Sequence, residues 1–327
     1  MISPPLKILL TACSIGLTLS ASAAGTLFGI SALENAVYRI DTETGTAILV
    51  GETEFEPPEG VFTAPPTALA SDSTRGIVWA FLNRSDDLYT VDLATGQITS
   101  VATLSFENFF DVGLAYDPNR DLLYLSDGSN FLYSFDPDEG EVNLIGNLES
   151  NFSGMAFDVE NNILYGVTGQ YEELHILNPT TAETTLVGNL GFNINTSGLA
   201  FDPETETLYL TERNQDSLYT VNTTTGAATL IGPLGIEDIT GLTFLVEQEP
   251  QEITITSIAR ENILATIGFE GTSGNEYFLL KSLDLDFSNA TTVDQVTLED
   301  QNGIMEDNSA EEEAAFYRVS LAPQNQE

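Results

Sequence analysis

The chain has almost no cysteine, one histidine and little positive charge. Its 327 residues include a single cysteine, Cys13, a single histidine, His175, and nine lysines and arginines against 50 aspartates and glutamates. One histidine supplies neither a zinc set nor an identifiable catalytic triad. A surface this acidic repels phosphate, so no nucleic-acid partner and no anionic membrane partner is expected.

The first 24 residues are predicted to be a secretory signal peptide. A short basic leader, MISPPLK, precedes the apolar run ILLTACSIGLTLS and the small residues ASAA. The run is too short for a permanent membrane span, and no transmembrane segment is predicted. Cleavage after Ala23 or Ala24 would remove the only thiol, which excludes disulfides, thiol enzymes and zinc–thiolate sites. As an alternative, LTAC at 10–13 resembles a lipobox that would place a lipid on Cys13.

A six-residue phrase dominates the rest of the sequence. GLAFDP at 198–203 has variants beginning at residues 68, 113, 154 and 241, with spacings of 41 to 45 residues. This is the length of a four-stranded propeller blade. Three further short apolar runs follow each complete phrase and are separated by turn residues such as DLATGQ, so each unit is predicted to be a four-stranded antiparallel sheet.

The alternation within the phrase predicts how the sheets stack. Leu199 and Phe201 point to one face of the strand, and Gly198 and Ala200 point to the other. A bulky face can therefore pack on the small face of the next sheet, and the leading glycine suits strands that crowd around an axis.

The two ends of the repeat array predict its closure. Residues 26–51 supply three strands without a first one, and residues 241–246 supply a first strand without followers. The fold class is therefore all-β, a five-bladed β-propeller at residues 25–246 whose ring is closed by its last strand. The repeat resembles those of exported bacterial β-propellers of the YVTN and quinoprotein-like kind. This resemblance implies the fold but no single function, because such propellers include enzymes, binders and structural proteins.

A second β-rich region follows a polar linker at 247–252. Residues 253–322 contain five or more predicted strands and are expected to form a small β-sandwich, with a tail at 323–327. The ending AFYRVSL resembles a C-terminal module of exported proteins from planctomycete- and verrucomicrobium-like bacteria. That resemblance implies attachment or export. The protein is expected to be a monomer.

The predicted binding site is the channel mouth formed by the loops before each first strand. Small side chains precede the phrase, and the loops add phenylalanines and asparagines that could stack on sugars or grip a peptide. The phenylalanines could instead fill the rim between blades. The predicted ligand-binding residues are Thr67, Phe106, Asn108, Phe109, Asn151, Phe152, Ser153, Asn193, Ser197 and Thr240.

The same loops carry acidic residues that provide an alternative, catalytic or metal-binding site. The favoured interpretation is that they are ordinary surface acids suited to salty water, but they could instead form a metal-binding or acid–base set. No cofactor is predicted; if an ion binds, Ca²⁺ is the candidate. The acids concerned are Glu107, Asp111, Glu149, Glu237 and Asp238.

These features favour an exported, non-catalytic binding or scaffold protein for a glycan, peptide or protein partner. The alternative is a metal-assisted hydrolase or lyase that uses the loop carboxylates. His175 aligns with Tyr89, Tyr133 and Tyr219 in the third strands, so it is expected to be a packing residue.

Overall fold

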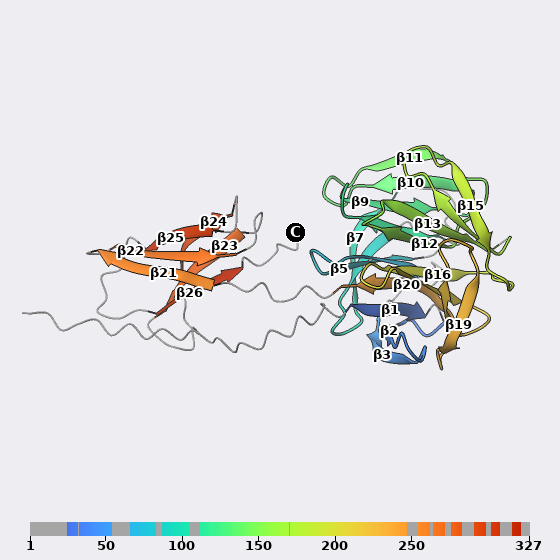
Figure 1. The fold of residues 1–327 in the computed structure, drawn as a ribbon, viewed down its shortest axis with the longest axis horizontal. Coiled ribbons are helices and arrows are strands. Elements are labelled where there is room, and N and C mark those ends of the chain that lie inside the picture. The colour runs from blue at the N-terminus through green and yellow to red at the C-terminus, as the bar shows by residue number, and fades with distance from the viewer. Residues whose placement is uncertain are drawn as a thin grey trace, which may run out of the picture. The chain divides into compact units, whose positions relative to one another are not determined.

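All regular elements in the part of the chain that the computed structural model describes are β-strands (Figure 1). They form two compact units, one with the strands between residues 26 and 245 and the other with those between 254 and 321. None of the described residues belongs to a helix that is long and apolar enough to cross a membrane. The described ranges are 25–31, 33–53, 66–82, 87–104, 112–169, 171–246, 254–261, 264–271, 276–282, 291–298, 302–307 and 316–321.

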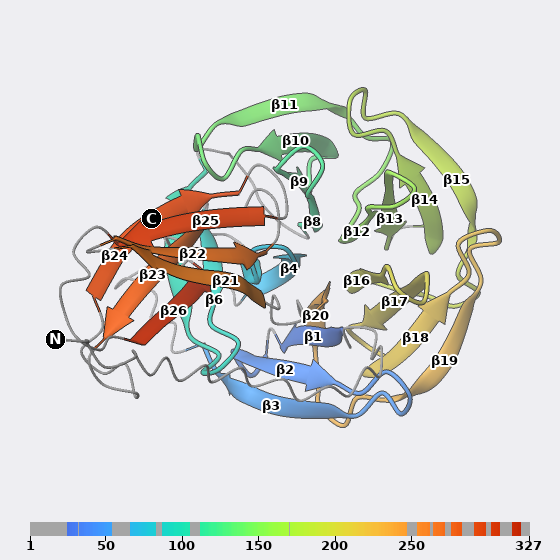
Figure 2. The same ribbon diagram turned by 60° about the vertical axis from the view of Figure 1, so that its left-hand side comes forward.

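The first unit is a five-bladed β-propeller, as predicted, with four antiparallel strands in each blade (Figure 2). From the axis outward, the first blade contains β20 (Ile239–Leu245), β1 (Thr26–Ser31), β2 (Ala36–Ile40) and β3 (Ala47–Glu52). The second contains β4 (Pro66–Asp72), β5 (Ile77–Leu82), β6 (Asp87–Val91) and β7 (Ile98–Thr103), and the third β8 (Leu114–Asp117), β9 (Leu122–Ser126), β10 (Phe131–Phe135) and β11 (Val142–Asn147). The fourth contains β12 (Gly154–Asp158), β13 (Ile163–Thr168), β14 (Glu173–Leu177) and β15 (Thr184–Asn189), and the fifth β16 (Ser197–Asp202), β17 (Thr207–Glu212), β18 (Ser217–Val221) and β19 (Ala228–Pro233).

The ring closes between the first and last strands of the propeller. β20 pairs antiparallel with β1, with Phe244 opposite Leu27 and Leu242 opposite Gly29. The predicted closure is therefore confirmed, and the innermost strand of the first blade comes from the far end of the array.

Adjacent blades pack a bulky face against a small face, as the alternation predicts. Ala200 and Tyr209 of the fifth blade share a buried cluster with Leu242 and Phe244 of the first. In this and three other interfaces, an aromatic ring on the second strand of one blade meets a ring on the innermost strand of the next. The pairs, with centroid distances, are Trp79–Tyr116 (4.8 Å), Tyr124–Phe157 (6.3 Å), Tyr165–Phe201 (6.2 Å) and Tyr209–Phe244 (6.2 Å).

Glycine is required where the innermost strands approach one another. A Cβ atom on Gly198 would lie 2.7 Å from the Leu242 Cβ atom and 2.8 Å from the Thr211 hydroxyl. A Cβ on Gly154 would lie 2.9 Å from the carbonyl oxygen of Ser197. All three distances are too short for a real side chain, so this end of the axis is closely packed.

The rim also depends on close backbone contacts. Each outermost strand has a bulge against its neighbour, which interrupts an exposed sheet edge. Behind the bulge of β15, a Cβ on Gly188 would lie 2.0 Å from the Thr225 carbonyl oxygen in the next blade. That turn contains Gly226 at φ +77°, and Asn222 Oδ1 accepts hydrogen bonds from the Thr224 and Thr225 amides at 2.9 Å.

The second unit consists of two three-stranded sheets. One has the order β21 (Thr254–Glu261), β22 (Leu264–Glu270) and β25 (Asn302–Asp307), and the other β24 (Thr291–Thr297), β23 (Glu276–Ser282) and β26 (Phe316–Leu321). Ile267 and Phe269 of the first sheet share a buried cluster with Tyr277 and Leu279 of the second. A buried ion pair of 2.9 Å also joins the sheets, between Lys281 Nζ and Asp307 Oδ2.

Candidate functional site

The predicted hydroxyls at the loop end of the channel lie between strands. Ser153, Ser197 and Thr240 are buried, and the Ser153 and Ser197 hydroxyl oxygens are 3.1 Å apart. The Ser197 amide also donates to Ser153 Oγ at 3.3 Å. These groups hold neighbouring innermost strands together. Thr67 lies in β4, but its side chain is outside the described part, and ligand contact at this ring stays a prediction.

The predicted aromatic and amide residues divide into buried and exposed members. Phe152 is fully buried and packs edge-on against His175, with 5.3 Å between the ring centroids. Asn193 is exposed, and its neighbour Phe192 is half-buried and stacks on Tyr219 at 4.6 Å. Asn151 is half-buried. Phe106, Asn108 and Phe109 lie outside the described residues.

Among the described acids of the loop face, Asp238 lies close enough to Glu237 and Asp216 for their charges to act on it. Glu149 and Glu237 are exposed, whereas Asp238 is buried and forms an ion pair of 2.6 Å with Arg213. Burial raises the pKa of Asp238, although Arg213 opposes the shift. Within the described ranges, no three histidine, cysteine, aspartate or glutamate side chains are grouped so that they could hold a metal ion. Glu107 and Asp111 lie outside those ranges.

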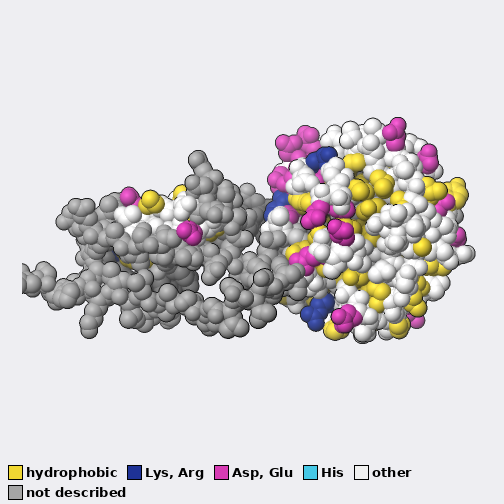
Figure 3. Space-filling view, viewed as in Figure 1, with side chains coloured by type: hydrophobic (Ala, Val, Ile, Leu, Met, Phe, Trp, Pro, Cys, Tyr) yellow, Lys and Arg dark blue, Asp and Glu magenta, His cyan; other side chains and the backbone are white. Residues whose placement is uncertain are grey.

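On the face of the propeller that Figure 3 shows, acidic side chains are dispersed rather than gathered in one place. The 50 acidic residues of the sequence, against nine basic residues, give the whole chain a formal charge of −41. The long-range field around the protein therefore favours cationic and neutral ligands over anions.

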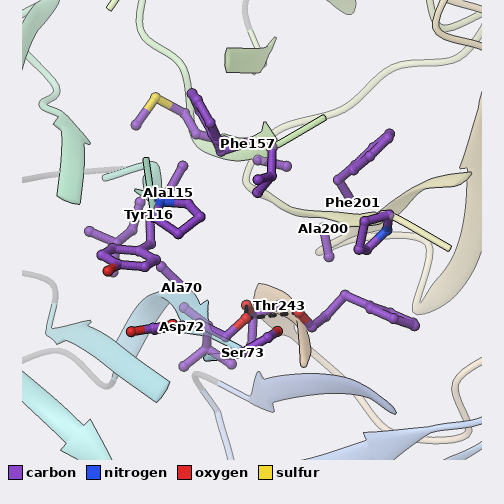
Figure 4. A pocket seen from close by; sticks show the side chains of 18 of the residues that line it. Ala70, Asp72, Ser73, Ala115, Tyr116, Phe157, Ala200, Phe201 and Thr243 are labelled. Carbon is purple, nitrogen blue, oxygen red and sulfur yellow. Dashed lines mark hydrogen bonds between the residues drawn. The ribbon is translucent and has the colours of Figure 1, made fainter. Parts of the chain in front are cut away.

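A cavity of about 310 Å³ lies at the other end of the innermost strands, where they run into their turns (Figure 4). All five blades contribute to it through the second, third, fourth and sixth positions of the repeated phrase. The second and third positions are Leu69, Ala70, Leu114, Ala115, Met155, Ala156, Leu199, Ala200, Leu242 and Thr243. The fourth and sixth are Ser71, Ser73, Tyr116, Pro118, Phe157, Val159, Phe201, Pro203, Phe244 and Val246.

Four blades give this cavity an aromatic wall. Tyr116, Phe157, Phe201 and Phe244 occupy the fourth position, and all four retain only 7–8% exposure. Beside them, the third position is alanine in four blades, which leaves room on the axis. The wall is thus formed by the same rings that lock neighbouring blades together.

The serine and threonine hydroxyls of the wall lie where the first and second blades meet, and the fourth blade adds the carboxylate of Glu160. Ser71 stands at the fourth position of the second blade and Thr243 at the third position of the first. The Thr243 hydroxyl donates to Ser71 Oγ at 2.9 Å, and Ser71 donates to the Phe244 carbonyl oxygen at 2.8 Å. Ser73 Oγ accepts a hydrogen bond of 2.9 Å from the Val246 amide.

An ion pair lies beside the polar wall. Asp72 is buried and accepts hydrogen bonds from Thr74 and from the Arg75 guanidinium. Burial alone would raise the pKa of Asp72, but these hydrogen bonds outweigh it and hold the pKa below its usual value. Arg75 also donates to the Tyr116 hydroxyl at 2.7 Å and lies over the Trp79 ring. Arg75 also pairs with Asp121, so Asp72 shares its charged partner with a second carboxylate.

Sequence reasoning placed the site at the opposite end of the channel and did not identify this cavity. The usable signal was a departure from the repeat: ALASDS has serine where the other blades have an aromatic residue, and GLTFLV has threonine in place of alanine. Neither change interrupts the alternation of the strand, so the repeat pattern alone does not mark these two positions as functional.

Comparisons with known proteins do not give a family. No protein-family model matches the chain, and no curated protein matches it. Among solved structures, it is similar to a chain described as "Crystal structure of Nidogen/Laminin Complex", with a TM-score of 0.48 and 12% sequence identity. The match covers 87% of this chain and 98% of the other. The resemblance to YVTN and quinoprotein-like repeats stays a prediction.

Proposed function

We infer that the protein is an exported, non-catalytic binding or scaffold protein that engages a glycan, peptide or protein partner through the loop face of its propeller. The observation that carries this is the loop at 190–196. It presents the exposed amides of Asn193 and Asn195 next to the half-buried Phe192–Tyr219 stack. An aromatic surface with neighbouring amides suits sugar rings and peptide groups, since it combines apolar contact with paired donors and acceptors.

The arrangement of the loop acids supports binding over catalysis. A metal-assisted hydrolase or lyase would bring several carboxylates to one point. Glu149 and Glu237 face solvent instead, and Asp238 is paired with Arg213. The raised pKa of Asp238 is the one observation that favours the enzyme, because a carboxyl group of this kind can act as an acid.

A binding screen with the full chain tests the proposal. Oligosaccharide and peptide panels are examined by thermal shift, because a ligand of the native state raises the melting temperature with concentration. Phe192→Ala and Asn193→Ala are expected to weaken a hit about tenfold. Asn143→Ala, an exposed asparagine on β11, is the matched control. Equal binding by all three variants would contradict a site on this loop.

Two further measurements address export and the alternative function. The N-terminus of the protein recovered outside the cytoplasm is expected at residue 24 or 25, and a lipid-sized mass increase on Cys13 would indicate the anchored form instead. Stabilisation by Ca²⁺ that is lost in Asp238→Asn and Glu237→Gln would favour the metal-dependent enzyme.

A further inference from the structure

The five blades are nearly equivalent around the axis except at one interface. The other four place an aromatic ring over the alanine of the preceding blade, and at the first–second interface these positions are Ser71 and Thr243. Phe28, which corresponds to the paired rings on the second strands of the other blades, has no partner of that kind in the second blade because Ser71 stands there. The exception replaces a ring with hydroxyls on the wall of the central cavity.

The size of the cavity limits what it can hold. Its volume of about 310 Å³ is roughly twice that of a 150 Å³ protein cavity known to bind benzene. Its lining is more apolar than polar and includes four aromatic side chains and the apolar residues Leu114, Met155 and Leu199. A molecule with one or two fused rings matches this space and surface.

The charges near the cavity favour a neutral occupant. The charged side chains among the described lining residues are Asp72 and Glu160, and both are acidic. Asp72 is paired with Arg75, a guanidinium that it shares with Asp121, and Glu160 is exposed at the edge. An anion would be repelled by the lining and by the chain as a whole, and a cation would find the buried carboxylate already occupied.

The hydroxyls specify the polar group of that occupant. Thr243 Oγ1 and Ser71 Oγ each donate within the described structure and keep lone pairs that can accept a hydrogen bond. Ser73 Oγ accepts from Val246, and its own proton has no acceptor among the described residues. A ligand hydroxyl, which both donates and accepts, satisfies this set. We propose that the central cavity binds a small neutral aromatic alcohol, with its ring against the aromatic wall and its hydroxyl at Ser71, Ser73 and Thr243.

The test uses four probes that share a naphthalene body: 2-naphthol, 2-methylnaphthalene, 2-naphthoate and 2-naphthylmethylammonium. With the full chain at pH 7, 2-naphthol is expected to raise the melting temperature with concentration and to bind most tightly, as measured by calorimetry. No binding of 2-naphthol at its solubility limit would overturn the proposal. Tighter binding of the naphthoate or the ammonium would overturn the neutral class.

Variants locate the site. Ser71→Ala is expected to weaken 2-naphthol binding threefold to tenfold and to leave 2-methylnaphthalene unchanged, since one hydrogen bond is lost. The double variant S71F/T243A restores the aromatic residue and the alanine of the other interfaces and is expected to abolish binding of both. Ser100→Ala, an exposed serine on β7, is the control. Unchanged binding in the double variant would place the ligand elsewhere.

Ligand binding in the central cavity is independent of the loop-face function, so one can be disproved while the other stands. Phe192→Ala is expected to leave naphthol binding unaffected, because Phe192 is not among the cavity residues. Thermal melts of each variant without probe show whether it has folded, and a variant that does not fold is replaced by Thr243→Ala, which removes one hydroxyl without adding volume.

Discussion

The interface between the first and second blades differs from the other four in its side chains, although all five interfaces use the same arrangement of strands. In the four, a ring from one blade packs on a ring and an alanine of its neighbour, as Phe201 does on Tyr165 and Ala156. In the fifth, two hydroxyls bond to each other across the interface. The repeated packing stabilises the ring, whereas the exception gives the axis a polar wall. Departures from a repeat are thus the places to look for function.

Removing a ring from an ordinary interface is expected to have the largest effect. Phe201→Ala leaves a void between the fourth and fifth blades and should lower the free energy of unfolding by about 3–5 kcal/mol. Ser71→Ala, at the equivalent position, should cost about 1–3 kcal/mol, because it removes two neutral hydrogen bonds, one from Thr243 and one to the Phe244 carbonyl oxygen. Denaturant titration followed by the fluorescence of Trp79, the only tryptophan, measures both. Similar losses would mean that the two kinds of interface do not differ.

The rim provides a second contrast between interfaces. Gly188→Ala should cost about 1–3 kcal/mol, because its Cβ would overlap the Thr225 carbonyl oxygen. The second blade has Ala102 at the same position of its outer strand, and a Cβ on Gly140 in the facing turn would have no described atom within 4 Å. Ala102→Gly should therefore change stability by less than about 1 kcal/mol. A tolerated Gly188→Ala would show that the rims can separate freely.

The ion pair between Arg75 and Asp72 beside the cavity is expected to make a pH-dependent contribution to stability. Arg75→Met should cost about 1.5–3 kcal/mol near pH 7, since Asp72 then stays buried without its charged partner. The pKa of Asp72 is lowered in the folded protein, so its contribution is present above its unfolded pKa of about 3.9 and is lost as the pH falls through the folded value. The difference in the free energy of unfolding between the wild type and Arg75→Met should therefore become smaller below about pH 4.

Arg120→Met is the matched control for that series. Arg120 also pairs with a buried aspartate three residues before it, Asp117, but its side chain is 41% exposed against 26% for Arg75, which in addition pairs with Asp121. A smaller loss is expected, because solvent screens the pair more strongly. A pH-independent gap for Arg75→Met would exclude Asp72 as its cause.

The smallest expected effect is a gain. S71F/T243A should raise the free energy of unfolding by about 0.5–1.5 kcal/mol, the value of an added aromatic pair, here with Phe28. Ser71→Phe alone should destabilise, because Thr243 Oγ1 lies 2.9 Å from Ser71 Oγ and leaves no room for a ring. A destabilised double variant would mean that this interface cannot accept the packing of the others.

The sequence predicted the features that depend on local pattern. Alternation within GLAFDP fixes which side chains of Gly198–Phe201 share a face, and the missing first strand before Thr26 fixes the closure by β20. These follow from strand geometry, which needs no knowledge of distant contacts.

The site was less predictable, for physical reasons. Alternation does not state which end of a channel opens, because that depends on how closely glycines such as Gly198 bring the strands together. Loop residues have no period at all, so the burial of Phe152 and the exposure of Asn193 could not be distinguished beforehand. The cavity is also assembled from residues more than 170 positions apart, such as Ser71 and Thr243.

The pairing of β20 with β1 has a consequence for biosynthesis. During translation, β1 to β3 emerge first and must wait for the strand that covers them until residue 245 has left the ribosome. Contacts between such distant segments form slowly, since a long loop must close first. Until then the nascent chain exposes an unpaired strand edge at β1, which makes it a natural client for chaperones.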